Sequence, residues 1–153
     1  MSEDHPRVIT LPPAIYAGAF VLGLLLEYFW RTSVVGPALR IGLGAFLVLV
    51  GFAIMISGVR VFRTAGTNVE VYRPATSLVV TGPYQFTRNP IYVGMTMAYA
   101  GAGVLADSLW VLGLVVPVLV LMDYGVVRRE EQYLAEKFGD AYRNYSRTVR
   151  RWV

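Results

Sequence analysis

Long apolar runs are the feature that most restricts the fold of this chain. Four segments are apolar enough to cross the hydrocarbon core of a bilayer as helices, which takes about 20 residues. They run approximately from 11 to 30, 39 to 62, 91 to 106 and 109 to 127. Backbone polar groups in lipid must bond within their own segment, and the alternating pattern of a membrane β-barrel is absent. The sequence therefore predicts an all-α polytopic transmembrane bundle.

Composition agrees with a membrane protein. Of the 153 residues, 56% are hydrophobic and only 16% are charged, and the mean hydropathy is +0.52. The net charge is +4, but the charges flank the apolar runs instead of forming the basic patch of a nucleic-acid-binding protein. There is no cysteine, which excludes disulfides and thiolate metal sites, and we predict no metal site.

The basic residues predict the orientation of the bundle. If both termini lie in the cytoplasm, only Arg31 and Arg40 fall outside. The positive-inside rule favours this arrangement, and we expect a prokaryotic inner membrane. The inside set is Arg7, Arg60, Arg63, Arg73, Arg88, Arg128, Arg129, Lys137, Arg143, Arg147, Arg150 and Arg151.

Small residues and a proline predict how the spans pack. Gly44, Gly51 and Gly58 recur every seven residues in the second span, and Gly94 and Gly101 lie in the third. Small residues at such spacing let two helices approach closely, so we interpret them as packing positions. Pro117 is expected to kink the fourth span.

Two polar regions remain, and both are predicted to be cytoplasmic. The loop from 63 to 90 is rich in Gly and Pro, which break regular elements. From Arg128 onward, Leu134, Phe138, Tyr142 and Tyr145 recur at helical spacing, which predicts an amphipathic C-terminal helix on the bundle or the membrane surface. We expect one membrane-embedded domain over residues 1–153.

Polar side chains concentrate where the loop enters the third span. Pro90 fits the first turn of a helix, with Asn89 near its N-cap. Arg88 adds a permanent charge beside the free amides of the helix start, which favours an anionic group of a ligand. Arg88 and Arg128 are also explained as topology anchors.

A second polar group, Glu130 and Glu131, stands where the fourth span leaves the membrane. Adjacent helical residues point about 100° apart, so the two glutamates are expected to differ in role. Glu130 shares a stripe with Leu134 and Phe138, which turns it toward the bundle. A carboxylate there needs a cation or a ligand as partner, and an arginine is the expected partner of at least one glutamate.

These two regions together resemble a known family. The string GPYQFTRNPIY, followed about forty residues later by EEQYLAEKFGDAYRNYSRTVRRW, resembles the isoprenylcysteine carboxyl methyltransferase and phospholipid N-methyltransferase superfamily of integral membrane enzymes. The preceding FRTAGTNVEVYRPATSLVVTGPY also fits bacterial and archaeal members. The resemblance covers approximately residues 61 to 153.

The resemblance implies methyl transfer from S-adenosylmethionine to a lipid-like or membrane-dissolved carboxyl or amine acceptor at the cytoplasmic face. It places the cofactor-binding part within residues 63–153 and implies catalytic roles for Arg88, Glu130 and Glu131. Many members have histidine where this chain has Asn89, and asparagine does not take up a proton near neutral pH. The implied cofactor-binding residues are Gly82, Pro83, Tyr84, Arg88, Asn89, Pro90, Tyr92, Glu130, Glu131, Tyr142, Tyr145, Arg150 and Trp152.

Two alternatives stay open. Membrane sterol reductases are distantly similar in the C-terminal region, so a nicotinamide-dependent reductase is one. The other is a non-catalytic lipid-binding membrane protein. No GxGxxG motif is present, but membrane reductases of this type do not use one, so its absence does not separate these hypotheses.

Overall fold

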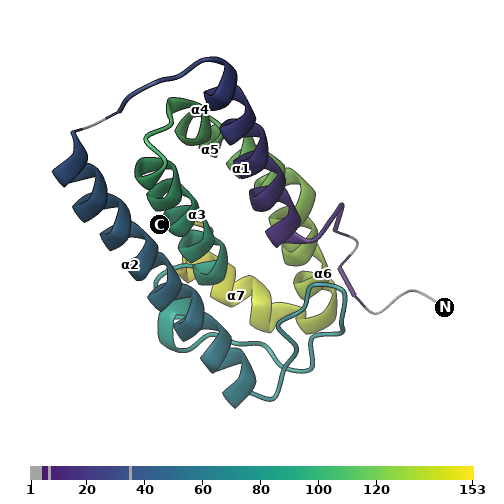
Figure 1. Ribbon diagram of the computed structural model, residues 1–153. Helices are drawn as coiled ribbons and strands as arrows, with labels where there is room; N and C mark the ends of the chain where they lie inside the picture. Colours follow the sequence, from purple (N-terminus) through teal and green to yellow (C-terminus); the bar gives the residue numbers. More distant parts are fainter. Residues whose placement is uncertain (1–4, 7, 35) are drawn as a thin grey trace.

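The protein is a bundle of helices, with no strand among the residues that the computed structural model describes, which are 5, 6, 8–34 and 36–153. Figure 1 shows the long helices side by side, with two short helices and a long loop gathered at one end. The elements are α1 (Pro12–Phe29), α2 (Pro37–Thr64), the 3₁₀ turn η1 (Gly82–Gln85), α3 (Pro90–Leu105), α4 (Leu109–Gly113), α5 (Val115–Met122), the π-helical turn η2 (Asp123–Val127), α6 (Arg128–Phe138) and α7 (Asp140–Thr148).

The first three predicted spans match α1, α2 and α3 to within a few residues. Each begins with a proline in its first turn, where the missing amide has no partner to lose. Helices α1, α2 and the continuous stretch Leu109–Phe138 are long and apolar enough to cross a membrane. Helix α3 has only 16 residues, or ~24 Å, against ~42 Å for the 28 residues of α2.

Glycines hold α2 and α3 in backbone contact, as their spacing predicts. A methyl group added at Gly51 would lie 2.6 Å from the carbonyl oxygen of Gly94, and one at Gly94 would lie 2.5 Å from the oxygen of Gly51. About two helical turns further along α3, a methyl group at Gly101 would lie 2.8 Å from the carbonyl oxygen of Gly44. A side chain at these positions would force the two backbones apart.

The fourth span is interrupted near Pro117, as predicted, but it extends further than predicted at its other end. The helix breaks at Leu114, between α4 and α5, because Pro117 has no amide to donate to Gly113. At the other end the helix does not stop at Val127 but continues through η2 into α6. The amphipathic segment then divides into α6 and α7 at Gly139, whose φ of +55° and ψ of −126° suit only glycine.

Most of the basic residues that were predicted to share one side of the membrane lie at one end of the bundle. Helices α1, α2, α3 and α5 alternate in direction, so the 65–89 loop and residues 128–153 lie at the same end (Figure 1). The N-terminal segment joins this end through a hydrogen bond of 3.1 Å from the Ile9 amide to the Gly125 carbonyl. Arg31 and Arg40 lie near the opposite end, and Arg7 falls outside the described residues.

Candidate functional site

A cavity of about 450 Å³ lies at the basic end of the bundle, within the usual range for a small-molecule site. Its walls come from segments far apart in the sequence: the start of α1, the last turns of α2, the loop before η1, the start of α3, and the helices α6 and α7. Most of the lining is apolar, and the polar side chains concentrate where α3 meets α6 and α7.

The unequal lengths of α2 and α3 create this space. Helix α3 begins at Pro90, near the level of Gly58, whereas α2 continues to Thr64, so Val59 and Phe62 form a wall beyond the start of α3. Met55 lines the same cavity but lies beside Gly94 of α3. Tyr84 of η1 partly fills the gap, with its ring 5.1 Å from that of Phe62. The end of α2 therefore serves as a cavity wall instead of a packing surface.

The loop from 68 to 79 forms the outer wall, and its base is held by side chains. The Thr67 hydroxyl accepts hydrogen bonds from the amides of Thr76 (3.0 Å) and Ser77 (3.4 Å). The amide of Ala75 donates to the Tyr133 hydroxyl of α6 at 3.0 Å. The first two bonds close the base of the loop, and the third ties the loop to α6.

Glu131 is enclosed by two arginines. Its Oε1 lies 2.9 Å from Nη1 of Arg88, and its Oε2 lies 2.7 Å from Nη2 of Arg151. Arg151 also reaches Asp123 of η2 at 3.3 Å, and Asp123 in turn accepts from Arg128 at 2.7 Å. Arg128, the third guanidinium of this cluster, is half-exposed and does not line the cavity. The Nε of Arg88 is buried and has no hydrogen-bond partner among the described residues.

Glu130 has a different environment. Its Oε1 accepts a hydrogen bond of 2.8 Å from the hydroxyl of Tyr92, and the side chain borders the cavity. None of the described cations forms an ion pair with it. A carboxyl group in this position has an oxygen left to accept a ligand's donor or to balance a cation.

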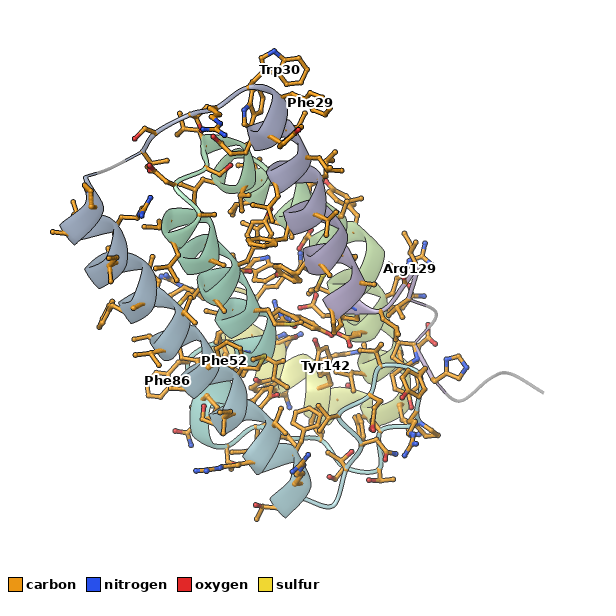
Figure 2. All side chains as sticks on the ribbon, viewed as in Figure 1. Phe29, Trp30, Phe52, Phe86, Arg129 and Tyr142 are labelled. Atoms are coloured by element: carbon orange, nitrogen blue, oxygen red, sulfur yellow. The ribbon has the colours of Figure 1, made fainter. Side chains whose placement is uncertain are left out.

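Tyrosines of α7 cover the polar end. The pKa values of Tyr142 and Tyr145 are raised to about 12, mainly by burial; for the pKa of Tyr142, the charge of Glu131 contributes to the rise and nearby Arg88 opposes it. Both hydroxyls are therefore neutral near pH 7. Tyr145 donates to the carbonyl of Tyr84 at 2.6 Å, which links α7 to η1. Figure 2 shows Tyr142 at the end of the bundle opposite to Phe29 and Trp30.

The structure brings most of the predicted site residues to one cavity. Those that line it are Tyr84, Arg88, Asn89, Tyr92, Glu130, Glu131, Tyr142 and Tyr145. Five others do not line it: Gly82, Pro83, Pro90, Arg150 and Trp152.

These five residues lie around the cavity in supporting positions. Gly82 takes a φ of +61° at the turn into η1, next to Pro83. Pro90 is fully buried at the start of α3. Arg150 is exposed, and its carbonyl accepts the amide of Arg88 at 2.9 Å. Trp152 packs on the core, and its Nε1 donates to Asp123 at 3.4 Å.

Sequence reasoning missed three polar residues of this region: Thr87, Asp123 and Arg151. A carboxylate inside a predicted span is a strong functional signal, and Asp123 carries that signal. Arg151 lies in a run of basic residues that the positive-inside rule already accounted for, so it was not singled out as a site residue. The loop wall also went unnoticed, because nothing in its sequence indicates which surface it covers. Within the described ranges, no group of three or more His, Cys, Asp or Glu side chains could hold a metal ion.

Several known proteins are similar to this chain. It is 33% identical over 135 residues to the cobalt-zinc-cadmium resistance protein CzcN of Cupriavidus metallidurans, which covers 84% of the chain and 56% of CzcN. It is 32% identical over 75 residues to the nickel-cobalt-cadmium resistance protein NccN of Alcaligenes xylosoxydans xylosoxydans, covering 49% of the chain and 35% of NccN. An uncharacterized protein of Haemophilus influenzae is 47% identical over 49 residues, covering 32% of the chain and 76% of that protein.

The chain thus spans about half the length of CzcN and about a third of NccN. The profile of a family described as phospholipid methyltransferase matches residues 39–141, which include α2, α3 and the cavity's polar residues as far as α6. On this match, the chain belongs to the phospholipid methyltransferase family of membrane proteins.

Proposed function

We propose that the protein transfers a methyl group from S-adenosylmethionine to a lipid-like or membrane-dissolved acceptor. One observation carries the proposal: Arg88 and Glu130, 42 positions apart in the sequence, border a single cavity whose lining is mostly apolar. Family membership supports methyl transfer in general, whereas the choice of cofactor and acceptor rests on the chemistry of this cavity.

The donor set of the cavity suits the cofactor. S-adenosylmethionine carries a carboxylate together with ammonium and sulfonium cations. Arg88 borders the cavity and has a buried Nε with no hydrogen-bond partner among the described residues, which favours the carboxylate. Glu130 has no ion-pair partner in the described part of the chain and favours a positive group. The rings of Tyr84, Tyr142 and Tyr145 offer faces for a cation or for stacking by adenine.

When bound, the cofactor supplies an already activated methyl group. The protein then has to orient the acceptor and exclude water, and the apolar lining favours both. A carboxylate acceptor needs no base. With an amine acceptor a proton must leave, and the Glu130 oxygen not bonded to Tyr92 is placed to receive it.

We further propose that this end of the bundle faces the cytoplasm of an inner membrane, because the basic residues gather there. The chain has no cysteine, so single cysteines at Ser146 and Ser33 provide clean labels for the two ends. In inverted membrane vesicles, a membrane-impermeant maleimide should label Ser146→Cys and spare Ser33→Cys. The reverse pattern would overturn the orientation.

Titration calorimetry with S-adenosylhomocysteine tests the cofactor. We expect saturable binding, and transfer of labelled methyl groups from S-adenosylmethionine into a lipid extract should identify the acceptor class. Binding of a nicotinamide dinucleotide in place of S-adenosylhomocysteine would instead favour a reductase. Cofactor binding without any methylated product would favour a lipid-binding protein. Absence of cofactor binding in folded protein would refute the proposed function.

A further inference from the structure

The segment Arg150–Trp152, here called the strap, is hydrogen-bonded to the residues just before α3. The amide of Arg88 donates to the Arg150 carbonyl at 2.9 Å. The side-chain amide of Asn89 donates to the Arg151 carbonyl at 2.8 Å, and the Thr87 hydroxyl donates to the same oxygen at 3.2 Å. Thr87 and Asn89 are both buried, and the bonds from their side chains are partly shielded from water.

Side chains fasten the strap on its other side. The Arg151 guanidinium donates to both oxygens of Glu131, at 2.7–3.1 Å, and reaches Asp123 at 3.3 Å. The ring of Trp152 packs against the core and donates to Asp123. The strap therefore joins three elements of the bundle: the start of α3, η2 and α6.

Arg88 takes part in both sets of contacts with the strap. Its backbone amide is bound to the strap, and its guanidinium shares Glu131 with Arg151. If Arg151 left, Glu131 would have Arg88 as its remaining ion-pair partner, and the positive charge available to a ligand would fall. If the bond from Asn89 were lost, the backbone of the strap would lose a buried donor beside Arg88.

We propose that Asn89 and Arg151 are positioning residues that act through the strap to keep Arg88 available for the cofactor. The amide of Asn89 is used to hold the Arg151 carbonyl, so its role is to anchor the strap and not to move a proton. This inference rests on the proposed function, since it concerns the affinity of the same cavity.

Trp152 makes the position of the strap measurable without activity. The other tryptophans, Trp30 and Trp110, contact each other at the far end of the bundle, with ring centroids 6.3 Å apart. In a Trp30→Phe/Trp110→Phe background, acrylamide quenching of fluorescence reports only on Trp152. The same samples can be titrated with S-adenosylhomocysteine.

The variants test whether the hydrogen-bond donor of Asn89 or the shape of its side chain holds the strap. Asn89→Asp keeps the shape but removes the donor and brings a carboxylate against the Arg151 carbonyl, whereas Asn89→His retains a ring N–H donor. We expect Asn89→Asp and Arg151→Gln to increase quenching and to weaken S-adenosylhomocysteine binding about tenfold. Asn89→His should retain most of the affinity. Arg143→Gln, which removes an exposed arginine of α7, is the matched control and should change neither quantity.

Two results would overturn this inference and leave the proposed function intact. One is increased quenching with unchanged affinity, and the other is unchanged quenching in both Asn89→Asp and Arg151→Gln. Thermal unfolding confirms that each variant is folded before titration. Absence of saturable binding by the parent protein would refute the proposed function, and the positioning role with it.

Discussion

The two ends of α2 contact the rest of the molecule in opposite ways. Toward its start, Gly44 and Gly51 press against the backbone of α3 and leave no room for a methyl group. Toward its end, Val59 and Phe62 line a cavity, because α3 begins near the level of Gly58 and does not cover the last turns of α2. One helix thus supplies both a tightly packed contact in the bundle and a wall of the candidate site. The point at which α3 begins decides which part of α2 has which role.

We therefore expect that added side-chain volume disrupts folding near the start of α2 and disrupts ligand binding near its end. Gly51→Val should have the largest effect, because its new side chain would meet the backbone of Ala98 and Gly94 at 2.6 Å. We expect a loss of at least about 3 kcal/mol in the free energy of unfolding. Thermal unfolding in detergent measures it. Gly42→Val, on the same helix with open space around it, controls for the helix propensity of valine.

Glu130→Gln should affect ligand binding and leave folding intact. The substitution preserves shape and removes the carboxyl group that can balance a cationic group of the ligand, so the Kd for S-adenosylhomocysteine should rise about 10- to 100-fold. The midpoint of thermal unfolding should stay close to that of the parent. Glu136→Gln changes an exposed glutamate of the same helix and should bind normally. Equal affinities of the two variants would remove Glu130 from the site.

Val59→Trp should fill part of the apolar end of the cavity. We expect the KM for the lipid acceptor to rise about tenfold, with little loss of stability, since the new ring occupies space that the protein leaves open. Steady-state methyl transfer at fixed cofactor concentration measures this change. Ile56→Trp points a similar ring away from the cavity on the same helix, and an equal rise in KM for it would contradict the assignment of the wall.

Gly58→Ala should have the smallest effect, because Gly58 stands at the boundary between the two regions. Its new methyl group would meet the side chain of Ile91 at 2.9 Å and the Tyr84 hydroxyl at 3.5 Å, not backbone. Side chains can shift, so we expect a cost of about 1 kcal/mol or less in unfolding free energy. A loss as large as that of Gly51→Val, measured by the same thermal unfolding, would show that tight packing extends to the cavity.

Hydropathy and small-residue spacing predicted the packed region well. The span limits near 11–30 and 39–62 match α1 and α2, and the glycines at 44, 51, 94 and 101 meet as expected, because both signals are local properties of single helices. Pro117 indicated the interruption at Leu114. The passage through η2 into α6 was harder to predict, because it depends on how backbone hydrogen bonds rearrange around Asp123.

The cavity region was only partly predictable. Helical geometry indicated that Glu130 and Glu131 point in different directions, and the structure gives them different partners, Tyr92 and two arginines. The strap could not be foreseen, because its bonds run from side chains to backbone carbonyls some 60 residues away and leave no pattern in the sequence. Resemblance brought the two polar segments together in the prediction, whereas spacing alone did not.

The most direct test of the central claim is an experimental structure of the protein in complex with S-adenosylhomocysteine. We expect the nucleotide inside the cavity at the start of α3, with polar contacts from both Arg88 and Glu130. A nucleotide bound elsewhere on the protein, or a cavity that stays empty at saturating ligand, would contradict it.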